Sequence, residues 1–163
     1  MRYHNITKDD MLNGDGLRAV LWVAGCTHKC KGCHNPVTWD IEGGIPFDDA
    51  AKEELFEELK KDYVSGVTFS GGDPFHLENR EEIGALAKEI REKFPDKTIW
   101  LYTGYEWEEI CHLSFLSNID VIVDGKFKIE EKDDNLHWKG SANQRVIDVK
   151  ASLRAGEVRL YQE

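Results

Sequence analysis

Long apolar segments are missing from this chain of 163 residues. The longest apolar run, residues 19–24, is far shorter than the roughly 20 residues that a helix needs to cross a bilayer. Residues 1–7 also lack the apolar stretch of a secretion signal. We therefore expect a cytoplasmic protein with no membrane partner.

Basic residues are scarce as well. The chain has 21 Lys and Arg residues against 31 Asp and Glu residues, a formal net charge of -10. Because an acidic chain has no general attraction for a phosphate backbone, we expect no nucleic-acid partner. The sequence shows no internal repeat, low-complexity tract or linker rich in Pro, Gly and Ser. Residues 1–163 are therefore expected to form a single domain.

Cysteine is rare but concentrated. Cys26, Cys30 and Cys33 fall within eight positions, and the fourth cysteine, Cys111, stands alone. In a reducing compartment such a cluster indicates metal or redox chemistry rather than a disulfide framework. A 4Fe–4S cluster normally takes four cysteines, so three leave one iron without a protein ligand. That iron could bind a small molecule, as the open position of a catalytic zinc does.

A structural zinc site is the alternative for this loop, with His28 or His34 as the fourth ligand. Zinc sites usually combine two short cysteine pairs across a longer spacer, and no second pair follows here. Cys111 lies on a predicted helix and is expected to be a small buried residue, with a role as fourth ligand as its alternative.

Apolar periodicity predicts alternating strands and helices. Strands are expected over residues 17–24, 64–70, 98–103, 119–123 and 145–149, and helices over 48–63, 79–94 and 106–117. Asn79 and Glu82 have the spacing of a capping box at the start of the second helix. Alternation of this kind implies a parallel sheet covered by helices. Because a complete barrel takes about 250 residues, we expect an incomplete parallel β/α barrel, a partial TIM-type fold.

Unusual loop residues follow the predicted strands. The cysteine cluster follows the first strand, residues 71–74 (Gly-Gly-Asp-Pro) the second, 103–105 the third and 124–126 the fourth. In parallel sheets the active site lies at the carboxyl ends of the strands, so these loops are expected to share one pocket that holds the cluster. Taken alone, residues 71–74 also suit a simple turn between strand and helix.

The spacing Cys-x3-Cys-x2-Cys resembles the signature of the radical S-adenosylmethionine superfamily. More narrowly, the chain resembles the activating proteins of anaerobic ribonucleoside-triphosphate reductase. The stretches that carry this resemblance are residues 13–16, 25–35, 38–39, 70–74, 101–105, 123–127 and 138–144. They extend over most of the chain, and the later stretches separate this group from the rest of the superfamily.

The resemblance implies an enzyme whose Cys26, Cys30 and Cys33 hold a 4Fe–4S cluster. S-adenosylmethionine would chelate the fourth iron through its amino and carboxylate groups. Reductive cleavage would give methionine and a 5′-deoxyadenosyl radical, which takes a hydrogen atom from a glycine of the reductase. The resemblance also implies an electron donor such as flavodoxin.

The residues expected to bind S-adenosylmethionine are Gly32, Cys33, His34, Gly71, Gly72 and Asp73. The two later glycines allow a backbone to approach a ligand closely, and the Asp73 carboxylate can accept a hydrogen bond from an ammonium group. The segment around His34 lies beside the cluster and is expected near the adenine. Many relatives have a phenol at that position, but a histidine ring can also stack.

Several alternatives stay open at this point. Residues 143–145 either contact cofactor or partner, or cap the last strand, whereas Asp124 and Lys126 favour a surface turn over a pocket. An activator of another glycyl-radical enzyme, such as pyruvate formate-lyase, is usually longer, and residues 140–144 argue against it. A radical enzyme for small molecules would need additional substrate-binding segments. The remaining class is a zinc-binding interaction module without catalysis.

Overall fold

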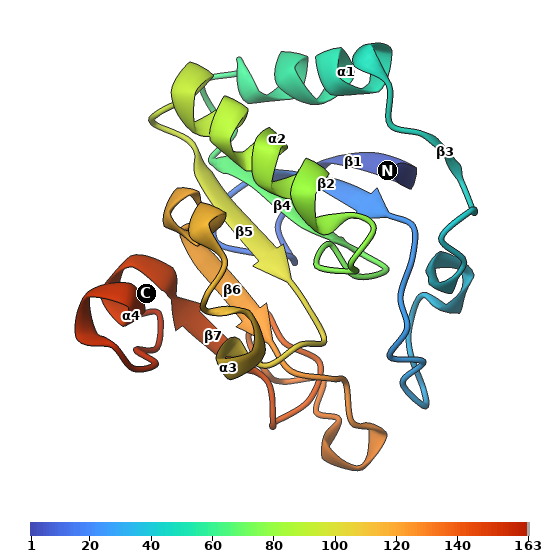
Figure 1. Cartoon of the computed structure of the whole chain (residues 1–163), viewed down its shortest axis with the longest axis vertical. Coiled ribbons are helices and arrows are strands. Elements are labelled where there is room, and N and C mark those ends of the chain that lie inside the picture. Colours follow the sequence, from blue (N-terminus) through green and yellow to red (C-terminus); the bar gives the residue numbers. More distant parts are fainter. Residues whose placement is uncertain (163) are drawn as a thin grey trace.

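The computed structural model describes residues 1–162 and places the strands of this part of the chain in one mixed sheet (Figure 1). The order across the sheet is β3-β1-β2-β4-β5-β6-β7. The strands are β1 (Arg2–Asp10), β2 (Arg18–Val23), β3 (Ile45–Pro46), β4 (Gly66–Gly71), β5 (Thr98–Tyr102), β6 (Val121–Asp124) and β7 (Arg145–Asp148). The α-helices are α1 (Asp49–Leu59), α2 (Arg80–Lys93), α3 (Trp107–Ile110) and α4 (Val149–Ala155), and the 3-10 helices are η1 (Pro36–Trp39), η2 (Ser114–Asn118) and η3 (Ile129–Glu131).

All but one of the elements predicted from apolar periodicity are confirmed. The five predicted strands are β2, β4, β5, β6 and β7, and the first two predicted helices are α1 and α2. The third predicted helix is divided between α3 and η2. Strand β1 lies outside the predicted elements, because its sequence is mostly polar. Its pairing with β2 is interrupted by register shifts.

The expectation of a wholly parallel sheet is wrong at both edges. Strands β2, β4, β5 and β6 are parallel to one another, whereas β1 and β3 on one side and β7 on the other are antiparallel to their neighbours. Residues 125–144 connect the carboxyl end of β6 to a neighbouring strand, β7, that begins at the same end of the sheet. Such a connection yields an antiparallel pair. The fold class α/β is confirmed, and the incomplete barrel stays a prediction.

Helices α1 and α2 cover one face of the sheet (Figure 1). Buried apolar side chains from the four parallel strands, including Leu21, Phe69 and Ile122, join Leu55 of α1 and Ile83 of α2 in a single core. This core fixes the parallel strands side by side, so the loops at their carboxyl ends are held close together. Within residues 1–162, no helix has the length and the apolar content that crossing a membrane requires.

The capping box predicted for Asn79 is wrong. Its side chain makes no cap hydrogen bond. Instead, the fully buried Asn79 amide donates to the carbonyl oxygen of Ala24 at 2.8 Å. Ala24 comes directly after β2, so Asn79 fixes the start of α2 to the end of that strand. A cap would use Asn79 Oδ1 as the acceptor for a backbone N–H of the helix, but this buried oxygen has no hydrogen-bond partner among the described residues. The bond to the Ala24 carbonyl orients the side chain instead.

The amino ends of the parallel strands are organised by Arg18, a fully buried side chain. Its guanidinium donates to the Thr68 hydroxyl at 2.9 Å and to the Thr98 hydroxyl at 2.8 Å. It also donates to the carbonyl oxygens of Val67, Thr98 and Asp15. Burial lowers the pKa of Arg18 to about 10, so the group is still a cation at neutral pH. Arg18 therefore connects β2, β4 and β5 through their backbones.

Candidate functional site

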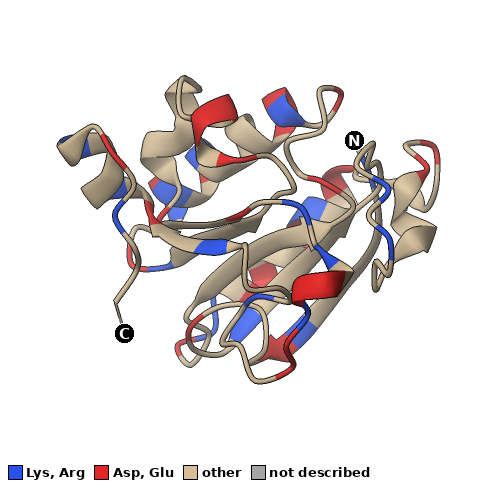
Figure 2. Ribbon diagram, turned by 90° about the horizontal axis from the view of Figure 1, so that it is seen from below, with Lys and Arg blue, Asp and Glu red and all other residues tan. Residues whose placement is uncertain are grey.

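The loops that follow the parallel strands meet at a cavity of about 140 Å³. The cavity is lined by Cys26, His28, Cys30, Cys33, Thr38, Trp39, Ser70, Gly71, Gly72, Asp73, Tyr102, Thr103, Gly104, Gly125, Phe127 and Gln144. The prediction that the cysteine loop and residues 71–73 share one pocket at the carboxyl ends of the strands is confirmed. In Figure 2, which views the molecule from below the orientation of Figure 1, acidic and basic residues are interspersed along the ribbon.

Backbone N–H groups surround the sulfur atoms of the cysteine loop. The amides of His28 and Lys29 donate to the Cys26 sulfur, and the amide of Phe127 donates to the Cys30 sulfur. The amide of Asn35 lies 3.4 Å from the Cys33 sulfur. Burial raises the pKa of Cys26 and of Cys30, whereas the N–H groups act in the opposite direction by favouring the thiolate. The loop thus offers three sulfurs with donors already in place.

The cavity also contains a donor that the chain does not satisfy. Trp39 lines the cavity, and its buried indole N–H has no acceptor among the described residues. Buried polar groups nearly always have a partner, so this N–H suits a bound group that offers a sulfide or carboxylate acceptor. Three thiols with N–H donors and one unpaired N–H fit an iron–sulfur cluster with a carboxylate-bearing ligand beside it.

The cysteine side chains share a cavity without converging on a point. Within residues 1–162, no group of three or more His, Cys, Asp or Glu side chains is arranged to hold a single metal ion as it stands. A cluster binds each thiolate through a different iron, so its ligands surround a volume rather than one ion.

The glycines of the second loop are explained by neighbouring backbone. Gly71 has φ +103°, and a Cβ there would lie 2.6 Å from backbone atoms of Val23. A Cβ on Gly72 would lie 2.5 Å from the Gly25 carbonyl oxygen and 2.8 Å from that of Thr38. Gly71 therefore admits the end of β2, and Gly72 admits the backbone at the two ends of the cysteine loop. Their expected contact with a ligand stays a prediction.

Asp73 is a buried residue of the loop that follows β4. Its Oδ1 accepts hydrogen bonds from the Phe75 amide and the Thr103 hydroxyl, both at 2.8 Å. Its Oδ2 accepts from His28 Nε2 at 2.6 Å and from the Gly104 amide at 3.0 Å. The carboxylate therefore joins the cysteine loop, its own loop and the loop after β5. The signal for His28 in the sequence was only its position between two cysteines.

Two of the residues expected near adenine do not line the cavity. A Cβ on Gly32, whose φ is +78°, would lie 2.7 Å from Ile129. The exposed His34 ring packs edge-on against Phe127, with the centroids 5.4 Å apart. Both contacts connect the cysteine loop to the segment after β6. Cys33 lines the cavity together with the other two loop cysteines.

The later polar residues mainly hold loops in place. Asp124 accepts hydrogen bonds from the Trp107 amide and from Arg145, so it joins β6, α3 and β7. Gln144 lines the cavity and also bonds Gly125 and Gly140. Hydrogen bonds to Asp124 and Glu108 raise the pKa of Arg145. The prediction that Cys111 is buried is wrong, because it lies exposed directly after α3.

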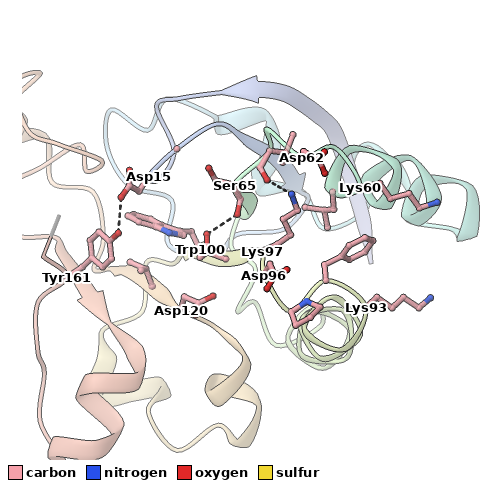
Figure 3. A pocket seen from close by; sticks show the side chains of 17 residues that line it. Asp15, Lys60, Asp62, Ser65, Lys93, Asp96, Lys97, Trp100, Asp120 and Tyr161 are labelled. Atoms are coloured by element: carbon pink, nitrogen blue, oxygen red, sulfur yellow. Dashed lines mark hydrogen bonds between the residues drawn. The ribbon is translucent and has the colours of Figure 1, made fainter.

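A larger cavity of about 850 Å³ lies at the opposite, amino ends of the parallel strands (Figure 3). Its lining includes Lys97, Trp100 and Tyr161, and no cysteine. The Lys97 ammonium donates to the carbonyl oxygens of Lys61 and Val64, and the Tyr161 hydroxyl donates to Asp15. These polar groups are engaged with the chain, so size alone does not make this cavity the functional site.

Comparison with known proteins points to the smaller cavity. The profile of a family described as "4Fe-4S single cluster domain" matches residues 12–147. The anaerobic ribonucleoside-triphosphate reductase-activating protein of Enterobacteria phage T4 is 45% identical over 146 residues, which cover 90% of this chain and 93% of that protein. The proteins of the same name from Haemophilus influenzae and Escherichia coli K12 are 41% and 40% identical over 150 residues, covering 90% of this chain and 97% of each relative.

Proposed function

Because the chain belongs to the 4Fe–4S single cluster domain family and to the family of anaerobic ribonucleoside-triphosphate reductase-activating proteins, we propose that it is a radical S-adenosylmethionine enzyme. Its substrate is the anaerobic ribonucleoside-triphosphate reductase, on which it generates a glycyl radical. The whole chain, residues 1–163, acts as one radical S-adenosylmethionine domain in the cytoplasm.

The proposed ligands of the cluster are Cys26, Cys30 and Cys33, which share the small cavity. When bound and reduced, the cluster supplies one electron that breaks the C5′–S bond of S-adenosylmethionine, giving methionine and a 5′-deoxyadenosyl radical that takes a hydrogen atom from the glycine. The backbone amides of His28, Lys29 and Phe127 stabilise the thiolate form of their sulfurs. With three cysteines, one iron is left for the amino and carboxylate groups of the cosubstrate.

The cosubstrate is proposed to lie across the carboxyl ends of β2, β4 and β5. Its methionine end lies against residues 71–73, which line the cavity, and its adenine lies toward Gly32, Cys33 and His34. The indole N–H of Trp39 is free to donate to the cluster or to the cosubstrate carboxylate. A one-electron donor such as flavodoxin completes the reaction.

One observation carries this proposal: three cysteine sulfurs from one short loop line one cavity at the carboxyl ends of parallel strands, each with a backbone N–H directed at it. Carboxyl ends of parallel strands are where such folds place their chemistry.

The test is an anaerobic reconstitution with iron and sulfide, followed by chemical reduction and mixing with S-adenosylmethionine and the reductase. We expect a brown protein, formation of 5′-deoxyadenosine and a glycyl-radical signal in electron paramagnetic resonance of the reductase. A parallel mixture with pyruvate formate-lyase should give no signal. A colourless protein that holds zinc, or a radical on pyruvate formate-lyase alone, would refute the assignment.

A further inference from the structure

The Asp73 carboxylate has its hydrogen-bonding capacity filled by the chain. It is 1% exposed, and it accepts from Phe75, Thr103, His28 and Gly104 at distances between 2.6 and 3.0 Å. A carboxylate offers about four lone-pair sites. An ammonium group that bound to Asp73 would therefore have to displace one of these donors, and three of them come from the rigid neighbourhood of Asp73 itself and of the end of β5.

His28 is the donor that reaches Asp73 from the cysteine loop, and the residues packed around its imidazole fix the position of the ring. Its ring lies where residue 104 would carry a side chain, because a Cβ on Gly104 would be 2.4 Å from His28 Cδ2. The Tyr105 ring packs edge-on against the imidazole, with the centroids 4.7 Å apart. The side chain of His28 is 7% exposed. The imidazole is thus enclosed by the loop after β5.

The rest of the cysteine loop has few connections to its surroundings. Among the described residues, the side chains of residues 27–34 make two hydrogen bonds to groups outside residues 26–35: His28 with Asp73, and Cys30 with the Phe127 amide. Lys29 adopts φ 48°, a left-handed conformation that is unusual for a residue with a side chain. The His28 amide is also a donor to the Cys26 sulfur. The placement of Cys26 therefore depends on where the imidazole is held.

We propose that His28 is a positioning residue, which through Asp73 holds the cluster-binding loop in register with the loop that receives S-adenosylmethionine. Asp73 accordingly serves as the acceptor for His28 and for the loop after β5 rather than for the ammonium group of the cosubstrate. This inference rests on the proposed function. It also excludes His28 Nε2 as a metal ligand, because that nitrogen is engaged with Asp73.

The first test compares His28→Phe with His28→Gln, and uses His112→Phe as a surface control because His112 is exposed. We expect His28→Phe to bind iron and sulfide as the unchanged protein does. Its KM for S-adenosylmethionine should rise about tenfold or more, which is the size of effect found when a residue that orients metal ligands is replaced. The change that S-adenosylmethionine causes in the electron paramagnetic resonance spectrum of the reduced cluster should weaken in parallel. His28→Gln, whose amide N–H can reach Asp73, should restore part of both.

The second test is a double-mutant cycle between His28→Gln and Asp73→Asn, which also serves if His28→Phe fails to fold. Two residues that act through one contact give effects on S-adenosylmethionine affinity that do not add. If Asp73 bound the ammonium group directly, Asp73→Asn would exceed His28→Gln by a wide margin and the effects would add, which would overturn the proposal.

Two further outcomes would also overturn it: an unchanged KM in His28→Phe, or a loss of iron as complete as that caused by removing a cysteine. Failure of the proposed function is distinguishable from these, because the unchanged protein itself would then lack iron–sulfur absorption.

Discussion

The two ends of the parallel strands are each organised around one buried charged side chain. At the amino ends, Arg18 donates to β4 and β5 and to the carbonyl of Asp15, so most of its partners belong to the strands themselves. At the carboxyl ends, Asp73 accepts from three loops, and two of its partners are loop side chains, His28 and Thr103. The first arrangement fixes the sheet, and the second fixes loops relative to one another.

A buried charged side chain therefore has different consequences at the two ends of the parallel strands. The amino ends have the larger cavity, but their polar groups are bonded to the chain. The carboxyl ends have the smaller cavity, with three thiols and an unpaired N–H. Substitutions at the amino ends should therefore change stability, and substitutions at the carboxyl ends should change chemistry.

The largest effect is expected for Cys30→Ala at the carboxyl ends. Removing one of three thiolates should abolish cluster assembly and glycyl-radical formation, because no other cysteine in the described residues lies in the cavity. Iron analysis and electron paramagnetic resonance measure both. The matched control is Cys111→Ala, which removes an exposed thiol and should keep full iron content. A radical signal generated by Cys30→Ala would contradict the assignment of the ligands.

Arg18→Met should give the next largest effect, on stability alone. The substitution leaves the carbonyl groups of Val67 and Thr98 without their buried donor. The expected loss is about 2 to 4 kcal/mol in the free energy of unfolding, measured by urea denaturation. Iron content per folded molecule should be unchanged. A folded Arg18→Met protein that loses its cluster would erase the distinction between the two ends.

Gly72→Ala and Gly156→Ala should lower the free energy of unfolding by similar amounts, but only Gly72→Ala should also lower the iron content. The new Cβ at residue 72 meets the Gly25 carbonyl oxygen at 2.5 Å, so it should cost about 1 to 3 kcal/mol and lower the iron content. Gly156 ends α4 with φ 72° and has nothing within 4 Å of the added atom, so its cost of about 1 to 2 kcal/mol comes from backbone strain. Equal iron content in the two variants would show that residue 72 does not control the cysteine loop.

The smallest effect is a pH dependence at the amino ends. Burial, together with the hydrogen bond to Asp15, raises the pKa of Tyr161 to about 12. A raised folded-state pKa contributes stability that is complete below the unfolded value of about 10 and is lost as the pH rises through about 12. The urea midpoint should therefore fall more between pH 8 and pH 11 for the unchanged protein than for Tyr161→Phe. Identical falls would remove this role for the Tyr161 hydroxyl.

Much of the fold could be predicted because its parallel strands are buried on both faces. Their continuous apolar runs, such as residues 64–70, leave few alternatives to a central strand. Strand β1 could not be predicted in the same way, because it lies toward an edge and most of its positions are polar. The Asn13-Gly14 pair between β1 and β2 is a turn signal that pointed to an antiparallel partner.

The site was predictable only in part. Three cysteines in one loop and glycines after a strand carry their signals in consecutive residues, and these loops do meet in one cavity. The contact between His28 and Asp73 joins residues 45 positions apart through side chains, so no local pattern announces it. Asn79 shows the same limit, because the spacing to Glu82 suited a cap, whereas the side-chain amide is oriented by its hydrogen bond to the buried Ala24 carbonyl, 55 positions earlier in the chain.

The missing side chain at Gly104 has a consequence for how this protein can diverge. The imidazole of His28 fills the space that a methyl group at residue 104 would need. A side chain at residue 104 therefore clashes with the ring as long as His28 is present. Shortening residue 28 first avoids that clash but leaves a void beside Asp73 until residue 104 fills it. The two positions, 76 residues apart in the chain, should be inherited as a pair.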